Sequence, residues 1–306
     1  MIDVLIIGYG SIGRKHAKLL SKNKKVNDIY VVTSQKISNY ITINLNDLKD
    51  IDPKLIIISN ITSLHIKTIK FIEKIYKNKR VLVEKPIFAK MDRFKPRNNN
   101  YYVGYNLRLH PVIRKIKAII KNKIIWHVDI KLESYLPDWR KNIIYSKSNS
   151  SNKSMGGGVL LDLSHELDYL NLLFGKINPL YCYNGKKSDL DIDSDDLLIM
   201  SGHFGNSKKR TSLSLMINSF SKNNSREIRI AGKDISIVGD IRNNVIKYTF
   251  KDKYKIIKFK KNSLEDTYSE QHNLIINGVT KELCSFSDAI DTLSLITKLR
   301  KINNYV

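Results

Sequence analysis

The sequence opens with MIDVLIIGYGSIG, residues 1–13, and this stretch decides the fold of the first part of the chain. Residues 2–7 form a short β-branched apolar run that predicts a buried strand, and the apolar spacing over residues 11–22 predicts a helix. The turn between them contains three glycines in the pattern GxGxxG: Gly8, Gly10 and Gly13. Such a turn lets a pyrophosphate approach the backbone and the start of the helix, where Ser11 and Ile12 lie. The stretch therefore predicts a Rossmann domain that binds a dinucleotide.

The order of the strand and helix patterns changes near residue 110, which divides the chain into two predicted domains. Within residues 1–110, helical patterns alternate with apolar strand patterns at residues 29–33, 55–59, 81–83 and 101–105. This alternation predicts a doubly wound parallel sheet, the α/β class. Over residues 111–306 a helical pattern at 159–173 is followed by strand patterns without helices between them, which predicts an α+β domain with a largely antiparallel sheet. A final helix near residues 285–299 could pack back on the first domain.

Length and composition favour two domains in a reducing compartment. A chain of 306 residues with 42% hydrophobic residues can bury two cores. Its two cysteines, Cys182 and Cys284, are too few for a disulfide framework and lack the spacing of a metal site. Asp3 stands where a signal peptide would be basic, and no apolar run approaches the length of a membrane span. We therefore expect a cytoplasmic protein with no membrane partner and no metal.

The formal net charge of +24 raises the question of nucleic-acid binding, since clustered basic residues neutralise phosphates. The lysines are instead dispersed among asparagines and isoleucines, a composition that A+T-rich codon usage would produce. We therefore expect no nucleic-acid partner. A small anionic substrate such as a nucleotide sugar agrees with the charge.

The end of the second predicted strand bears on the choice between NAD and NADP. In NAD-selective Rossmann domains an acidic residue about 20 positions after the glycines binds the ribose 2′-hydroxyl. Here the segment is Val32-Thr33-Ser34-Gln35-Lys36, which has no carboxylate. The hydroxyls of Thr33 and Ser34 beside Lys36 could hold a 2′-phosphate instead. We therefore favour NADP over NAD, with weak discrimination between them as the alternative.

A charged pair follows the strand pattern at residues 81–83. Glu84, Lys85 and Pro86 come at the carboxyl end of this strand, the edge of a doubly wound sheet where ligands bind. A lysine ammonium at that edge can donate to a substrate hydroxyl or a developing alkoxide. Lys85 is therefore a candidate catalytic residue.

The segment GGGVLLDLSHELD, residues 156–168, supplies a second candidate for acid–base chemistry. Positions three and four apart share a face of a helix, so Asp162 is expected to meet His165 and Glu166. A carboxylate beside an imidazole can raise the histidine pKa and give an acid–base group near neutral pH. The alternative is a helix-face ion pair with a satisfied histidine. The second histidine of a zinc motif is absent, which agrees with the expectation of no metal.

The segment YLPDWR ends in an aromatic residue and an arginine, Trp139 and Arg140. Trp139 could stack on a sugar or a base, and Arg140 could hold a phosphate or carboxylate. Both are candidate substrate-binding residues. A packed interface loop is the alternative for Trp139.

With its glycine fingerprint, EKP tripeptide and GGGxLxD segment in this order, the chain resembles the Gfo/Idh/MocA family of oxidoreductases, named after glucose-fructose oxidoreductase and myo-inositol dehydrogenase. The resemblance covers essentially the whole chain. It implies an open sheet in the second domain that mediates homodimers or homotetramers, and the oxidation or reduction of sugars, inositols or nucleotide sugars. Segments similar to YLPDWR and GGGVLLDLSHE occur in members linked to bacterial surface-sugar synthesis.

The resemblance also implies roles for particular residues. Lys85 matches the family's substrate-facing lysine, and its neighbours Glu84 and Pro86 match residues that shape the nicotinamide pocket. The following residues fall in the segment that lies along the cofactor in relatives: Ser59, Asn60, Thr62 and His65. Asn106 and Arg108 fall in a segment that contacts substrate.

The chain departs from the family pattern at one position. Relatives place a histidine four residues after the aspartate, whereas here His165 is three residues after Asp162 and Glu166 occupies the fourth place. Either residue could carry the proton, and we favour His165. Glu166 is then a candidate substrate-binding residue.

These observations lead to one functional hypothesis and two competitors. We expect an NAD(P)-dependent oxidoreductase that moves a hydride to or from a hydroxyl-bearing carbon of a sugar-like molecule, with Lys85, His165 and Asp162 as catalytic residues. The alternative is a dinucleotide-binding sensor or regulatory protein without chemistry. Nucleic-acid binding is the third possibility.

Overall fold

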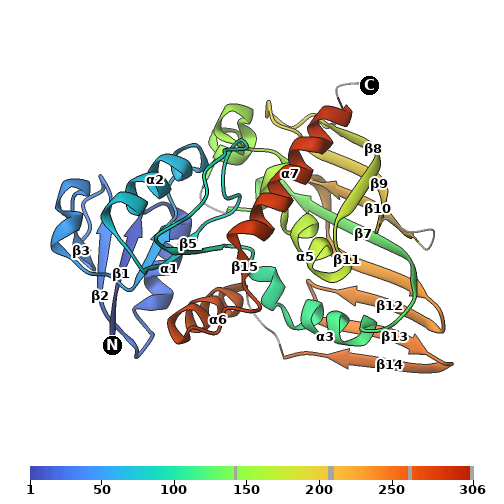
Figure 1. The fold of residues 1–306 in the computed structure, drawn as a ribbon. Coiled ribbons are helices and arrows are strands. Elements are labelled where there is room, and N and C mark those ends of the chain that lie inside the picture. The colour runs from blue at the N-terminus through green and yellow to red at the C-terminus, as the bar shows by residue number, and fades with distance from the viewer. Residues whose placement is uncertain (141–142, 206–209, 261–263, 304–306) are drawn as a thin grey trace. The chain divides into compact units, whose positions relative to one another are not determined.

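Two compact units make up the protein (Figure 1). The computed structural model describes residues 1–140, 143–205, 210–260 and 264–303. The first unit contains Met1–Leu109 and Ser263–Leu293, and the second contains His110–Asn262 and Ser294–Val306. The first unit is therefore discontinuous in sequence, because residues far along the chain return to it. The last helix, α7 (Phe286–Asn303), begins in the first unit and ends in the second.

A seven-stranded sheet forms the centre of the first unit, in the order β15-β6-β5-β4-β1-β2-β3. Its strands are β1 (Ile2–Ile7), β2 (Val26–Val32), β3 (Ile41–Thr42), β4 (Leu55–Ile58), β5 (Arg80–Val83), β6 (Asn100–Val103) and β15 (Cys284–Ser285). All neighbours are parallel except β15, which is antiparallel to β6. The predicted parallel doubly wound sheet is confirmed. The strand order reverses between β1 and β4, and ligands bind at the carboxyl ends of strands beside such a reversal.

Helices cover both faces of this sheet because β1 and β4 are apolar on both sides, as buried parallel strands are. Helices α1 (Ser11–Leu20) and α6 (Leu264–Asn277) pack on the face that includes Val4 and Ile6. Helix α2 (His65–Ile75) packs on the opposite face. The glycine turn, and with it the start of α1, is thereby fixed at the carboxyl end of β1.

The second unit contains an eight-stranded sheet in the order β14-β13-β12-β11-β7-β10-β9-β8. Its strands are β7 (Ile125–Tyr135), β8 (Ile177–Gly185), β9 (Leu197–Phe204), β10 (Thr211–Asn218), β11 (Phe220–Gly232), β12 (Ile235–Asp240), β13 (Val245–Phe250) and β14 (Lys253–Lys258). Only the β7–β10 pair is parallel within the described residues, so the prediction of a largely antiparallel sheet is confirmed. The sequence patterns did not predict β8 and β12.

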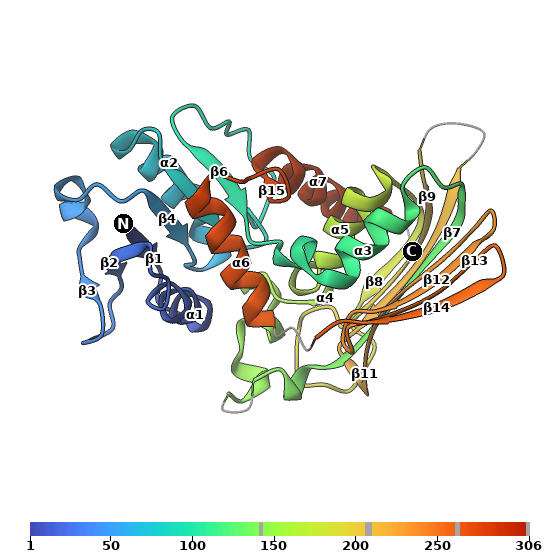
Figure 2. The same cartoon turned by 90° about the horizontal axis from the view of Figure 1, so that it is seen from below.

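Helices lie on one face of the second sheet (Figure 2). They are α3 (Pro111–Ile120), α4 (Val159–Asp162) and α5 (His165–Phe174). The prediction of one continuous helix over residues 159–173 is wrong, because the backbone leaves helical geometry at Leu163. The Ser164 hydroxyl donates to the Leu161 carbonyl at 2.9 Å, a side-chain contact that competes with the helical ladder. In the part of the chain that the structure describes, no helix is long and apolar enough to cross a membrane.

Candidate functional site

The glycine turn has the geometry that a pyrophosphate requires. A Cβ on Gly8 would lie 2.4 Å from the Asn60 nitrogen, and one on Gly13 would lie 2.0 Å from the Gly8 carbonyl oxygen. A Cβ on Gly10, by contrast, would meet nothing within 4 Å, so this residue faces open space at the start of α1. The first turn of α1 has no acidic residue and no side-chain cap. Its backbone N–H groups and dipole therefore suit an anion, and these residues fit a dinucleotide.

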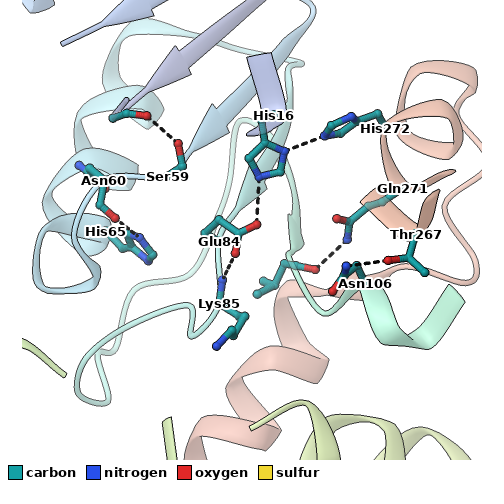
Figure 3. A network of polar contacts seen from close by, with 12 residues as sticks. His16, Ser59, Asn60, His65, Glu84, Lys85, Asn106, Thr267, Gln271 and His272 are labelled. Carbon is teal, nitrogen blue, oxygen red and sulfur yellow. Dashed lines mark hydrogen bonds and ion pairs between the residues drawn. The ribbon is translucent and has the colours of Figure 1, made fainter. Parts of the chain in front are cut away.

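Hydrogen bonds join the glycine turn to the ends of two neighbouring strands (Figure 3). The Ser59 hydroxyl donates to the Gly8 carbonyl at 2.8 Å. The buried His65 ring lies 3.1 Å from the carbonyl of Asn60 through Nε2 and 3.1 Å from that of Pro86 through Nδ1. Burial lowers the pKa of His65, although hydrogen bonds to these carbonyls oppose the shift. His65 therefore ties β4 to the Glu84–Pro86 turn, and Thr62 lies half-buried in the same loop.

Glu84 is the most constrained residue of the predicted cofactor set. Its buried carboxylate lies 3.0 Å from His16 Nε2 and accepts from the backbone N–H of Lys85 at 3.2 Å. Burial acts to raise the pKa of Glu84. The hydrogen bond and charge of His16, the Lys85 ammonium and the Lys85 N–H outweigh burial and hold the pKa below its usual range. The glutamate is therefore a buried anion next to the candidate catalytic lysine. Figure 3 shows the Lys85 side chain extending away from this carboxylate.

The two predicted substrate residues of the first unit are buried and have partners within that unit. Asn106 donates to the Thr267 hydroxyl at 2.7 Å, and Arg108 pairs with Asp288 at 2.8 Å. These contacts attach the segment after β6 to α6 and α7. Both side chains thus have a structural role that accounts for their presence, and their contact with substrate stays a prediction.

At the end of β2 the structure adds an arginine that the sequence patterns did not single out. Arg14 on α1 donates to the Gln35 side chain at 3.4 Å, and Gln35 donates to the Tyr9 carbonyl at 3.3 Å. The Thr33 hydroxyl accepts from the Gln35 N–H at 3.1 Å. Ser34 and Lys36 are exposed. Two exposed cations therefore belong to this region: Arg14 on α1, which contacts Gln35, and Lys36, which follows Gln35 in the sequence.

In the second unit the structure separates the roles of two neighbouring residues. Glu166 is fully buried, and its two oxygens accept from Arg226 on β11 at 2.6 and 2.9 Å. The Tyr169 hydroxyl lies 3.5 Å from the same carboxylate. Because a bidentate guanidinium engages both oxygens, we leave Glu166 out of the proposed acid–base and substrate residues.

His165 and Asp162 lie at the break between α4 and α5. Asp162 is the last residue of α4, His165 is the first of α5, and both are half-buried. Asp162 and His165 were expected to share a face of one helix. This expectation is wrong, because they belong to two separate helices. Trp139 and Arg140 follow a short 3₁₀ turn, Leu136–Asp138; Trp139 is half-buried and Arg140 is exposed.

Sequence reasoning missed four side chains that the structure places beside these candidates: Arg14, His16, Arg226 and His272. Only His16 gave a local signal, because it follows Gly13 by three positions on the buried side of α1. The contacts of Arg226 and His272 join segments that no sequence pattern relates.

A sequence model described as "Oxidoreductase family, C-terminal alpha/beta domain" of the Gfo/Idh/MocA group matches residues 127–297, more than half of the chain. The chain belongs to the Gfo/Idh/MocA family. The resemblance seen in the motifs is thereby confirmed.

A curated relative also matches part of the chain. The chain is 29% identical over 191 residues to the uncharacterized oxidoreductase YrbE of Bacillus subtilis (strain 168), a match that covers 56% of this chain and 53% of the relative. The matched region thus spans about half the length of that relative.

Solved structures share the fold over nearly the whole chain. Levoglucosan dehydrogenase in complex with NADH superposes with a TM-score of 0.84 at 16% identity, covering 99% of this chain and 97% of that one. UDP-N-acetylglucosamine 3-dehydrogenase of Acidithiobacillus ferrooxidans gives 0.79 at 15% identity, with coverage of 99% and 98%. An oxidoreductase of Desulfitobacterium hafniense described as NADPH-dependent gives 0.80 at 14% identity, with coverage of 100% and 96%. At these identities the likeness establishes the fold.

Proposed function

We propose that this protein is an NAD(P)-dependent dehydrogenase or reductase that acts on a hydroxyl-bearing carbon of a sugar, inositol or nucleotide sugar. The observation that supports it most is the position of Lys85. It lies at the carboxyl end of β5, in the same sheet as the glycine turn and hydrogen-bonded through its backbone to a buried anion. The sugar and nucleotide-sugar dehydrogenases with the same fold support the substrate class.

Each proposed residue has a definite chemical task. A nicotinamide, when bound, would supply the hydride chemistry. The Lys85 ammonium donates a hydrogen bond to the substrate hydroxyl and stabilises the oxygen as its proton leaves. His165 takes up or returns that proton, and Asp162 orients the imidazole or the substrate. Trp139 and Arg140 contact the part of the substrate away from the reacting carbon.

We propose NADP as the preferred cofactor, on the basis of charge at the end of β2. Arg14 and Lys36 are exposed there, and Thr33 and Ser34 add hydroxyl groups. A guanidinium forms a fork that suits a phosphate, and an arginine near this strand end accommodates a 2′-phosphate in NADP-binding Rossmann domains.

We also propose that the protein forms homodimers or homotetramers through the helix-free face of the second sheet. Large apolar side chains exposed on its strands include Tyr181, Ile199, Tyr254 and Ile256. Exposed apolar patches of this kind mark association surfaces. Sedimentation velocity would show a species of at least twice the chain mass.

The proposal is tested by substrate oxidation with purified protein. Oxidation of a panel of sugars, inositols and nucleotide sugars is measured with NAD or NADP. The reverse reaction is measured with the corresponding ketones and NADH or NADPH. Lys85→Met should lower kcat by about 100-fold or more, which is the range for a lost acid–base group, with cofactor affinity almost unchanged. Lys90→Met, an exposed lysine shortly after Pro86, is the matched control. Tight cofactor binding with no turnover of any compound would favour the sensor hypothesis instead.

A further inference from the structure

Three buried titratable side chains from distant parts of the sequence form one chain of hydrogen bonds in the first unit (Figure 3). Glu84 at the end of β5 contacts His16 Nε2 on α1 at 3.0 Å, and His16 Nδ1 contacts His272 Nε2 on α6 at 2.7 Å. The exposed fractions are 7%, 0% and 1%. We call these residues the Glu84–His16–His272 chain.

The donor and acceptor roles in the Glu84–His16–His272 chain depend on one another. An ionised carboxylate only accepts, so His16 Nε2 must donate to Glu84. A single proton then lies between the two imidazole rings. One ring donates it and the other accepts it, so the hydrogen-bonding role of each ring fixes that of the other. The ring of Tyr268 packs edge-on against His16 with the centroids 5.4 Å apart. Burial and the nearby His16 lower the pKa of His272. These neighbours exclude water from the chain.

Helix α6 supplies a polar face to this region although it is buried there. Thr267 accepts from Asn106, and Gln271 donates to the Val103 carbonyl at the end of β6 at 3.2 Å. Buried polar groups cost free energy unless they are hydrogen-bonded, so apolar side chains would stabilise this contact more simply. The polar contacts instead converge on the segments that follow β5 and β6.

We propose that His16 and His272 are positioning residues for Lys85 and act on it through Glu84. His16 holds the Glu84 carboxylate as an oriented anion, and His272 holds the His16 ring. Glu84 in turn accepts from the Lys85 backbone N–H and so fixes the backbone that carries the lysine. In this way α6, from the far end of the sequence, helps to set the lysine of β5. This inference rests on the proposed function, in which Lys85 meets the substrate.

The test compares a variant that breaks the chain with one that conserves its donor. His16→Leu removes both hydrogen bonds, while His16→Gln keeps an N–H near the position of Nε2. Three quantities are measured for each: kcat and KM for the substrate, the dissociation constant of NADPH, and the rate at which an amine-selective reagent labels Lys85, read by peptide mass spectrometry. Lys18, exposed on the same helix, is the internal standard for labelling.

We expect His16→Leu to lower kcat by about 10- to 100-fold, the range seen when an outer partner of a functional group is removed, with NADPH affinity nearly constant. Lys85 labelling should rise several-fold because Glu84, without its contact to His16, no longer holds the Lys85 backbone N–H and the side chain becomes more accessible to the reagent. His16→Gln should restore both values substantially. Unchanged kcat and labelling with a lowered melting temperature would overturn the inference, as would equal losses in both variants.

Two further outcomes remain decisive. If His16→Leu fails to fold, His272→Leu and His272→Gln are compared in the same way, and equal Lys85 labelling in these two variants overturns the inference. If the wild-type protein turns over no sugar, the proposed function fails, whereas a labelling rate that still depends on His16 supports the positioning role. Labelling that does not depend on His16 overturns the positioning role whatever the activity.

Discussion

Two buried glutamates invite comparison, because each is next in sequence to a proposed acid–base residue. Glu84 precedes Lys85 in the first unit, and Glu166 follows His165 in the second. Each carboxylate is held by a cation-forming side chain from another element: His16 on α1 for Glu84, and Arg226 on β11 for Glu166. Each unit therefore holds a buried glutamate directly beside a residue that we propose to handle protons.

The difference lies in the partner. A guanidinium stays charged at every working pH and engages a carboxylate with two hydrogen bonds, so the Glu166–Arg226 pair is a permanent anchor. The His16 imidazole is instead bound to a second imidazole, that of His272 on α6. The contact that holds Glu84 beside Lys85 thus extends over three elements, β5, α1 and α6, while the contact that holds Glu166 beside His165 is a single ion pair between α5 and β11.

The largest expected effect tests whether Glu166 is only an anchor. His165→Asn should lower kcat by about 100-fold or more because a proton carrier is lost. Glu166→Gln should lower kcat by less than about 10-fold, since its carboxylate is engaged by Arg226 and removal of a positioning contact has the smaller effect. Steady-state kinetics at several pH values measure both. A loss in Glu166→Gln that equals the loss in His165→Asn would make Glu166 the proton carrier.

The next effect concerns stability. Arg226→Met leaves a buried carboxylate without its partner and should lower the free energy of unfolding by about 3–5 kcal/mol, measured by urea denaturation. Arg229→Met, two positions along the same strand, is the control. Arg229 is exposed and pairs with a half-buried glutamate, so its loss should change stability by less than about 1 kcal/mol. Equal losses would show that the Glu166–Arg226 pair is not a special anchor.

The smallest expected effect is on the pH dependence of the free energy of unfolding. The pKa of His272 lies below its ordinary value of 6.5 because of burial, so the unfolded chain binds more protons than the folded one below that pH. Stability should therefore fall as the pH drops below 6.5, by up to about 1.4 kcal/mol per pH unit for one such histidine. Burial and Arg226 lower the pKa of His110 to about 4, which adds a slope of the same sign.

Variants separate these two contributions. His272→Gln should flatten the decline of the unfolding free energy on acidification, while Arg226→Met leaves the contribution of His272 in place. Chemical denaturation at a series of pH values gives both slopes. An identical slope in wild type and His272→Gln would show that His272 is not held uncharged in the folded protein.

The sequence predicted most of the fold because the decisive signals are local. Strand and helix periods and the glycine turn each depend on residues that are close together in the chain, and β1 has the predicted bounds, Ile2–Ile7. The helix over residues 159–173 failed because periodicity does not register a serine side chain that competes with the backbone at Ser164.

The candidate site was predicted only in part, for the same physical reason. Lys85 and His165 belong to short motifs and were identified as candidates without coordinates. Their anchors were not, because His272 lies 256 positions from His16 and Arg226 lies 60 positions from Glu166. No sequence pattern around His272 or Arg226 predicts those contacts. Only the return of α6 to the first unit, and the pairing of β11 with β7, bring them into place.

The measurement that tests the account most directly is a fluorescence titration of the purified protein with NADPH and NADH. We predict saturable binding of both, tighter for NADPH. Arg14→Gln should weaken NADPH by about tenfold, or 1.4 kcal/mol, with little effect on NADH, because one phosphate contact is lost. Lys18→Gln, the same charge change one turn further along α1, should leave both affinities unchanged. Tighter binding of NADH would contradict the cofactor assignment, and binding of neither would contradict the proposed function.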